Sequence, residues 1–179
     1  MDKPIIERIW AMPNKNTFSI LPIRNLILEE RYKTKGTWID PFANTSEFAD
    51  ITNDLDPSMP TDYHMEAMDF LKMFDDCSVD GVLYDPPFSP RQVKECYNKL
   101  NKTVSWMTTS CRYWSAQKDE IARILKPGGK VITCGWNSDG LGINRGFRLE
   151  RVLLVPHGGH KNDTIVTVET KKVARKTLL

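Results

Sequence analysis

The sequence lacks any apolar run that approaches the roughly 20 residues needed to span a bilayer. This absence excludes a protein that crosses a membrane as a helix. The first residues, Met1–Pro4, carry mixed charge and lack the long apolar stretch of a secretory signal. We therefore expect a cytoplasmic protein with no membrane partner.

Closely spaced cysteines and an excess of one charge are also missing. The four cysteines lie far apart and form no C-x-x-C pair, which argues against a zinc cluster or other metal site and favours free thiols in a reducing cytosol. With 25 Lys and Arg against 23 Asp and Glu, the net charge is only +2. This balance excludes a histone-like binder of nucleic acid but permits a local basic face.

Apolar residues are present in the proportion that a folded core needs. They make up 40% of the chain, and charged residues make up 27%. The 179 residues contain no repeat and no low-complexity linker, so we predict one domain over residues 1–179. This length suits one catalytic domain and leaves no room for a separate domain that would confer specificity.

Strand-like and helix-like patterns alternate along the chain. This alternation predicts an α/β fold with a mostly parallel sheet covered on both faces, ending in a hairpin. The predicted strands are residues 37–39, 49–53, 79–84, 130–136, 147–155 and 164–170. The predicted helices are a short one in residues 1–12, followed by 21–32, 64–74, 90–102 and 108–125, with a turn at 126–129.

Polar or turn-forming segments follow four of these strands. Ligands of parallel sheets bind beyond the carboxyl ends of the strands, so we expect the four segments to meet at one rim. They are Asp40–Asn44, Asp54–Asp56, Asp85–Phe88 and Trp136–Ser138.

The strongest feature is Asp85-Pro86-Pro87-Phe88, directly after an apolar strand. The two prolines hold the backbone extended and remove two N–H donors, which leaves the Asp85 carboxylate and the carbonyls as a rigid set of acceptors. Such a set suits the NH₂ group of a planar ligand that stacks on Phe88. A plain proline-rich turn is the alternative, but the preceding strand and the following aromatic ring favour a site.

This motif resembles the catalytic motif of the amino-methyltransferases that use S-adenosylmethionine, and its D-P-P-[YFW] form is typical of enzymes acting on adenine N6. The resemblance covers about residues 20–170 and is strongest to small enzymes encoded by phages and prophages. It implies a Rossmann-like class I methyltransferase fold with a seven-stranded sheet. It also implies S-adenosylmethionine as cofactor, and duplex DNA with a flipped adenine as substrate. Asp85 and Pro86 would then bind the amine and Phe88 the flipped base, with Pro87 as the remaining residue of the catalytic motif.

Cofactor residues follow from the same resemblance. Asp54 matches the acid that binds the ribose hydroxyls, with Asp56 as its alternative, and Asp69 matches the acid near the cofactor's adenine. The cofactor loop, usually D-P-F-x-G-x-G, corresponds to Asp40, Pro41, Phe42, Ala43 and Asn44. Ala43, Asn44 and Ser46 stand where glycines are usual, and Asn tolerates positive φ. Only nine residues separate Asn44 from Asp54, so the usual helix there is short or missing.

Two further clusters suit nucleic acid. Basic and aromatic side chains follow the motif on two predicted helices, and they suit phosphate contact and base stacking, although a solvated helix face is the alternative. The residues chosen are Arg91, Lys94, Arg112 and Trp114. His157 and His160 flank a glycine pair, where contact with nucleic acid or cofactor, a plain surface turn and a metal site are all open.

The sequence therefore predicts methyl transfer to adenine N6 in DNA, in a bacterial or phage-infected cytosol. Two alternatives are a methyltransferase for RNA or a protein amide, and a degenerate protein that binds DNA or cofactor without turnover. Sequence readout would come from residues 89–118 and the hairpin near 156–163, from a second subunit of a homodimer, or from a specificity partner. We expect short or relaxed sequence specificity.

Overall fold

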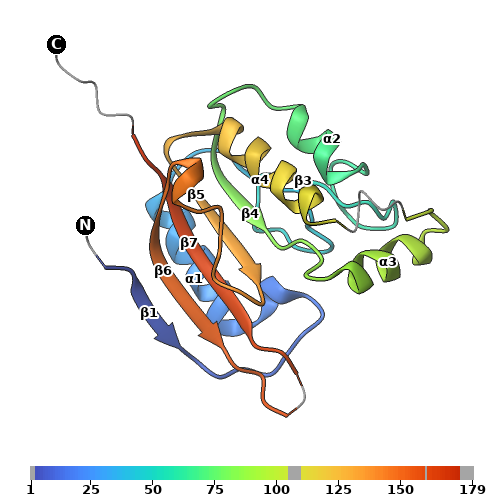
Figure 1. Ribbon diagram of the computed structural model, residues 1–179, viewed down its shortest axis with the longest axis horizontal. Helices are drawn as coiled ribbons and strands as arrows, with labels where there is room; N and C mark the ends of the chain where they lie inside the picture. Colours follow the sequence, from blue (N-terminus) through green and yellow to red (C-terminus); the bar gives the residue numbers. More distant parts are fainter. Residues whose placement is uncertain (1–2, 105–109, 160, 174–179) are drawn as a thin grey trace.

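The computed structural model describes residues 3–104, 110–159 and 161–173, and within these residues the strands form one seven-stranded sheet in the order β1-β6-β7-β5-β4-β2-β3 (Figure 1). The strands are β1 Ile5–Arg8, β2 Trp38–Asp40, β3 Ile51–Thr52, β4 Val79–Tyr84, β5 Leu125–Gly135, β6 Phe147–Val155 and β7 Thr164–Lys171. The helices are η1 Thr17–Ser19, α1 Leu21–Lys33, α2 Ala67–Lys72, α3 Pro90–Lys99, α4 Cys111–Ile124 and η2 Ile143–Arg145.

Strand direction agrees with the predicted fold class. β1 pairs with β6, β2 with β3 and β4, and β4 with β5, all in parallel. β7 runs antiparallel to both of its neighbours, β5 and β6. The mostly parallel sheet and its C-terminal hairpin are therefore confirmed.

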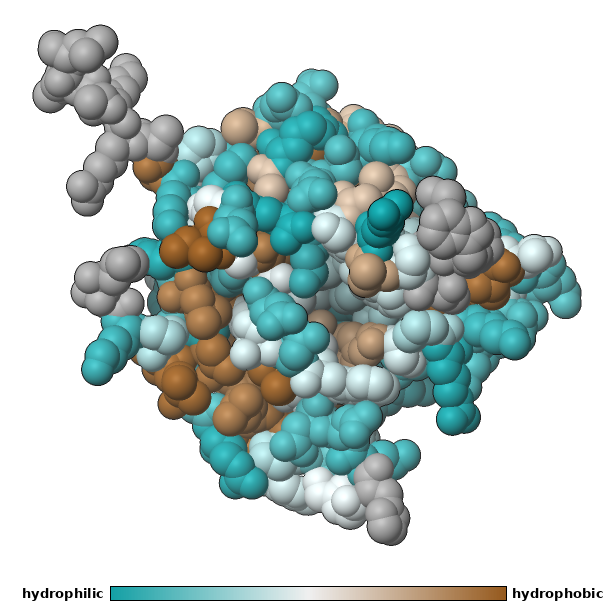
Figure 2. Space-filling view, viewed as in Figure 1, coloured by the Kyte–Doolittle hydropathy of each residue, from teal (hydrophilic) through white to brown (hydrophobic). Residues whose placement is uncertain are grey.

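The N-terminal segment differs from its prediction. Ile5, Ile6, Ile9 and Trp10 suggested the stripe of a short helix, but residues Ile5–Arg8 form strand β1 along the free edge of β6. The backbone of β1 pairs with the edge of β6 in parallel, and β-branched isoleucine suits a strand. The apolar side chains stay largely in solvent, with Ile6 67% exposed, and Figure 2 shows apolar surface on the side of the molecule where β1 and β6 lie. β1 is the seventh strand, which the strand patterns did not locate.

Helices cover both faces of the sheet (Figure 1). α1 packs its apolar stripe, including Ile23 and Ile27, against one face, where Leu83 of β4 is buried. Proline in its first turn suits the start of the helix. On the other face, α2 and α4 pack over Val82 and Tyr84 of the same strand. This alternation along β4 puts the Asp85 motif at the end of a strand that is held from both sides.

Several boundaries differ from the predicted ones. The predicted helix 64–74 begins only at Ala67, since the Asn53 side chain pairs with the Met65 backbone at 3.0 Å in both directions. Residues 126–129, predicted as a turn, lie within β5, where Gly128 has φ +85°. The helix predicted for 90–102 ends at Lys99. Residues 108 and 109 of the next predicted helix, together with His160 and the residues after 173, lie outside the described residues.

No helix in the described ranges is both long and apolar enough to cross a membrane.

Candidate active site

The predicted rim forms where β2, β3, β4 and β5 end. One groove is lined by Phe42 after β2, Asp54 after β3, and Asp85 after β4. Trp136 follows β5, and its ring lies 5.7 Å from that of Phe88 in an edge-to-face arrangement. The structure therefore brings together all four of the strand-end segments that the sequence singled out.

The Asp85–Phe88 segment is held by two helices. Trp114 of α4 donates from Nε1 to the carbonyl oxygen of Pro87 at 3.0 Å. Phe88 donates its backbone N–H to the side-chain oxygen of Gln92 on α3 at 2.6 Å. These bonds leave the carbonyl of Pro86 without a donor in the part of the chain that the structure describes. The local geometry matches the rigid set of acceptors that the prolines predicted.

One carboxylate oxygen of Asp85, at the end of β4, has no hydrogen-bond partner among the described residues. This oxygen, Oδ1, is buried. Burial raises the pKa of Asp85 to about 6, although a hydrogen bond from the Thr17 side chain acts in the opposite direction. Asp85 is therefore a carboxylate at neutral pH that can still accept hydrogen bonds.

Asp40 is a second buried carboxyl group. Its Oδ1 accepts from the Phe42 N–H at 3.0 Å, and its Oδ2 has no partner among the described residues. Burial raises the pKa of Asp40 well above its usual value, and the nearby charges of Asp85 and Asp54 raise it further. No lysine or arginine of the described chain forms an ion pair with these three carboxyl groups. Asp54 and Asp85 line the groove at the rim, whereas Asp40 is 0% exposed and lines none of the cavities described here. The groove therefore suits a cationic ligand at Asp54 and Asp85.

The predicted cofactor loop folds around Asp54. Asn44 has φ +52°, so it takes the left-handed conformation that glycine usually supplies. Its N–H donates to Asp54 Oδ2 at 3.0 Å. Asp54 also lines a cavity together with Pro41 and Phe42. The loop therefore closes without its glycines because the asparagine accepts the positive φ.

The other two predicted acids lie differently. Asp56 accepts hydrogen bonds from the backbone and hydroxyl of Ser58 in a turn, and it lines none of the cavities around the rim. Asp69 is exposed on α2 and lines none of them either. Met65 and Glu66, just before α2, line the small cavity beside Asp54 instead.

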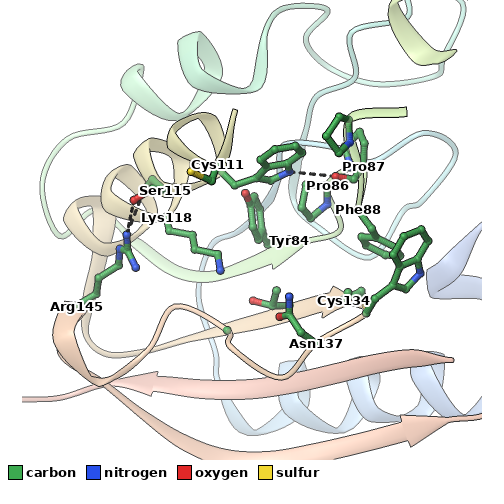
Figure 3. Close-up of a pocket in the computed structure, with 16 residues that line it drawn as sticks. Tyr84, Pro86, Pro87, Phe88, Cys111, Ser115, Lys118, Cys134, Asn137 and Arg145 are labelled. Carbon is green, nitrogen blue, oxygen red and sulfur yellow. Dashed lines mark hydrogen bonds between the residues drawn. The ribbon is translucent and has the colours of Figure 1, made fainter. Parts of the chain in front are cut away.

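Two large cavities lie on either side of the motif. One, of about 510 Å³, is lined by residues 15–19, residues 42–48 and Asp85. The other, of about 440 Å³, is lined by Pro86–Phe88 and by side chains of α4 and the end of β5 (Figure 3). The Asp85–Phe88 segment therefore separates two spaces, each large enough for a small organic group.

The predicted nucleic-acid residues fall into two groups. Arg91, Lys94 and Arg112 are exposed on α3 and α4, although Arg91 forms an ion pair of 2.9 Å with Glu95. Trp114 is half-buried, and its N–H is used by Pro87.

We predicted that His157 lies at the tip of a hairpin or in a surface turn, but the structure places it elsewhere. It is only 8% exposed, with ring nitrogens 2.9 Å from the Ala11 carbonyl and 2.8 Å from the Thr164 hydroxyl. It joins the hairpin to the N-terminal segment because a buried imidazole needs partners for both nitrogens. This geometry contradicts the predicted contact of His157 with nucleic acid.

Sequence reasoning identified Trp114 and included Lys118 in the basic and aromatic cluster, but it missed several other residues that line the cavities. α4 turns one face, at i, i+3, i+4 and i+7 spacing, toward the cavity of about 440 Å³. That face consists of Cys111, Trp114, Ser115 and Lys118. The helical spacing of these residues is visible in the sequence. The cavity that they line is formed by the end of β5 and the following loop, which the sequence of α4 does not specify. Residues 15–19 carried no pattern that could have identified them.

No family model and no curated protein matches the chain. Among solved structures, the N-methyltransferase NodS from Bradyrhizobium japonicum matches with a TM-score of 0.60 and 8% identity, over 90% of this chain and 100% of that one. A 1,6-didemethyltoxoflavin-N1-methyltransferase from Burkholderia thailandensis, solved with S-adenosylhomocysteine, matches with a TM-score of 0.55 and 13% identity, over 83% and 76%. This is the Rossmann-like methyltransferase fold.

A third match has the methyltransferase fold in a longer chain. TrmN from Thermus thermophilus shares 17% identity with a TM-score of 0.52, over 85% of this chain and 49% of its own. In the methyltransferase fold of the present chain, the carboxyl ends of the strands hold Asp40, Asp54 and Asp85. The position of these acids agrees with the rule for ligands of parallel sheets.

Proposed function

We propose that this protein transfers a methyl group from S-adenosylmethionine to the N6 amine of adenine in DNA. The observation that supports this proposal most directly is the Asp85–Phe88 segment between two cavities. It presents a buried, unpartnered carboxylate oxygen of Asp85 and a free carbonyl of Pro86. An aromatic NH₂ group has two hydrogens to donate, and this pair of acceptors complements it.

The residues on the other side of the segment fit the proposed cofactor. S-adenosylmethionine has a sulfonium and an ammonium group, and the negative charge of Asp54 and Asp85 at the groove would attract both cations. The fit rests on the three acids Asp40, Asp54 and Asp85, which lie together at the strand ends and form no ion pair with a lysine or arginine of the described residues. Asp54 would accept from ribose hydroxyls. When bound, the cofactor supplies an electrophilic methyl group.

The remaining steps belong to side chains of this chain. The lone pair of an aromatic amine is delocalised into the ring, which makes the amine a poor nucleophile. Hydrogen bonds to Asp85 and Pro86 favour a pyramidal nitrogen with a localised lone pair. Catalysis would then rest on positioning and electrostatics. Trp114 and Gln92 act as positioning residues because they hold the segment in place.

DNA as the substrate requires the adenine to leave the helix stack. Flipping costs a few kcal/mol, and stacking on an aromatic ring returns about 1–3 kcal/mol. Phe88, with Trp136 beside it, supplies aromatic surface at the mouth of the cavity. The exposed Lys94 and Arg112 would contact phosphates. Two solved structures of the same fold are named N-methyltransferases, which supports nitrogen as the acceptor atom.

The test is incorporation of tritium from labelled S-adenosylmethionine into unmethylated DNA, with RNA in a parallel arm. Wild type should label DNA at adenine N6, and Asp85→Ala should lose at least about 100-fold in rate. Asp75→Ala is the matched control, since Asp75 is an exposed acid in the loop before β4. It should label DNA as wild type does.

Three outcomes would contradict the proposal. Wild type that binds DNA and cofactor without labelling would support a degenerate binder. Labelling of RNA alone would change the substrate. Equal labelling by the Asp85→Ala variant would overturn the site.

A further inference from the structure

One ammonium group in the cavity of about 440 Å³ has no hydrogen-bond or ion-pair partner among the residues that the structure describes. Lys118 leaves α4 and extends into this cavity toward Tyr84 and Asn137 (Figure 3). The residue is half-buried, and no hydrogen bond or ion pair to its Nζ is found among the described residues. Buried charges are normally paired, so an unpaired one that lines a cavity points to a ligand.

The neighbouring cation shows the contrast. Arg145 lines the same cavity, but each of its three guanidinium nitrogens already donates a hydrogen bond to the protein. It donates to Asp119 at 2.6 Å, to the Ser115 hydroxyl at 2.8 Å and to the Leu141 carbonyl at 3.1 Å. Lys118 is therefore the cation of this cavity that remains available to a ligand in the part of the chain that the structure describes.

Burial makes an unpartnered Lys118 costly. It lowers the pKa of Lys118, and the charge of Arg145 acts in the same direction, while the carboxylates of Asp139 and Glu169 oppose both. A hydrogen-bond acceptor placed against Nζ would restore some of the lost solvation.

The position of Lys118 favours an acceptor on the base rather than on the DNA backbone. Tyr84 is paired in register with Thr133 of β5, and both residues line the cavity one position inside the Asp85 rim. Thr133 Oγ1 is buried and also lacks a partner among the described residues. Arg112, also on α4, is exposed and does not line this cavity, so a phosphate bound by Arg112 would stay in solvent. A group that reaches Lys118 must have entered the cavity.

We propose that Lys118 donates a hydrogen bond to a ring nitrogen of the target adenine and so helps to determine specificity. This inference rests on the proposed function, because it takes adenine as the target. With N6 at Asp85 and Pro86, adenine still presents N1, N3 and N7 as acceptors. Lys118 would bind one of them while Phe88 holds the ring.

The experiment uses binding, so that it needs no methyl transfer. Deoxyadenosine, its 1-deaza, 3-deaza and 7-deaza analogues and, as a fifth ligand, deoxyadenosine 5′-monophosphate are titrated by ligand-observed NMR, with saturating S-adenosylhomocysteine to fill the cofactor site. The proteins are wild type, Lys118→Met and the matched control Lys72→Met, which alters an exposed lysine of α2. Thermal unfolding checks that each variant folds.

Wild type and Lys72→Met should bind one of the three analogues about tenfold or more weakly than deoxyadenosine, as expected for a hydrogen bond to a charged donor. Lys118→Met should lose the same factor for deoxyadenosine and no longer distinguish that analogue. Absence of deoxyadenosine binding by wild type would contradict the inference. An equal loss of affinity of Lys118→Met for deoxyadenosine and for all three deaza analogues would contradict it as well. A loss confined to deoxyadenosine 5′-monophosphate would assign Lys118 to a phosphate and also overturn it.

The result separates the two proposals. If the NMR pattern holds but DNA is not labelled with tritium, only methyl transfer to DNA fails. If DNA is labelled but Lys118→Met binds like wild type, only the role of Lys118 fails.

Discussion

The protonation of Asp85 should control the proposed methyl transfer. Because burial raises its pKa to about 6, the carboxylate that accepts the amine hydrogen is lost as the pH falls below that value. We expect the single-turnover rate of methyl transfer to rise with pH through about 6. Asp85→Asn should lose at least about 100-fold in rate and show no step near pH 6. A wild-type rate that is flat from pH 5 to 8 would contradict this role.

The same pKa shift has a defined effect on stability. When the pKa of a carboxyl group is raised in the folded protein, its ionised form is less stable there than in the unfolded chain. The free energy of unfolding therefore decreases as the pH rises from about 4 to 6. At pH 8, Asp85→Asn should therefore be at least as stable as wild type. Calorimetric melting temperatures measure this directly, and a large decrease in the variant would show that Asp85 supports the fold.

Trp114 tests the positioning of the motif. Trp114→Phe keeps an aromatic ring but removes the N–H that donates to the Pro87 carbonyl at 3.0 Å. We expect kcat to fall about fivefold, in line with one hydrogen bond of about 1 kcal/mol, while the affinity for S-adenosylhomocysteine stays the same. An unchanged kcat would show that the motif is held without this bond.

At the scale of elements, Glu30 joins α1 to two strands. It is 1% exposed, and it pairs with Lys130 of β5 and, at 3.0 Å, with Arg151 of β6. Burial alone would raise the pKa of Glu30, but the hydrogen bonds from Lys130 and Arg151 outweigh it, so the pKa is lowered. Its contribution to stability is thus present above the pKa of the unfolded chain and is lost as the pH falls.

Removal of Glu30 would take one carboxylate from two cations that each keep another, since Lys130 also pairs with Glu150 at 3.2 Å and Arg151 with Glu7 at 2.7 Å. We expect Glu30→Ala to lower the free energy of unfolding at pH 7 by about 2–3 kcal/mol, because buried hydrogen bonds between charged groups are lost. Glu29→Ala is the matched control on the same helix. Its side chain is 48% exposed, so the loss there should be within about 1 kcal/mol. Urea titrations at pH 7 compare the two, and similar losses would contradict a special role for Glu30.

Elements also show where sequence patterns were sufficient. The β4 strand and α1 were predictable because a complete apolar strand or a helical stripe needs no distant information to form. β1 was not, since its four residues become a strand only beside the β6 edge. α2 begins late because the side chain of Asn53, 14 residues earlier, binds the backbone before it. Such boundaries depend on partners that are distant in the sequence.

At the scale of the whole molecule, cofactor binding should stabilise the fold. Asp54 and Asp85 line one groove, and their charges raise the pKa of the buried Asp40, so a cation in the groove would relieve the repulsion among the three acids. At 100 times its Kd, S-adenosylmethionine should add about 2.7 kcal/mol to the free energy of unfolding. We expect Asp40→Asn to weaken this stabilisation and Asp75→Asn to leave it unchanged. Thermal shift assays measure both, and no shift in wild type would contradict cofactor binding.

The sequence by itself determined the alternation of strands and helices and the placement of Asp85–Phe88 at a strand end. Both follow from local causes, namely apolar periodicity and the fixed backbone of two prolines. The tertiary structure alone decided that Lys118 faces a cavity, that His157 is buried and that Asp69 stays in solvent. Those outcomes depend on which surfaces meet when distant segments pack, and a side chain's own neighbours in the sequence do not specify that.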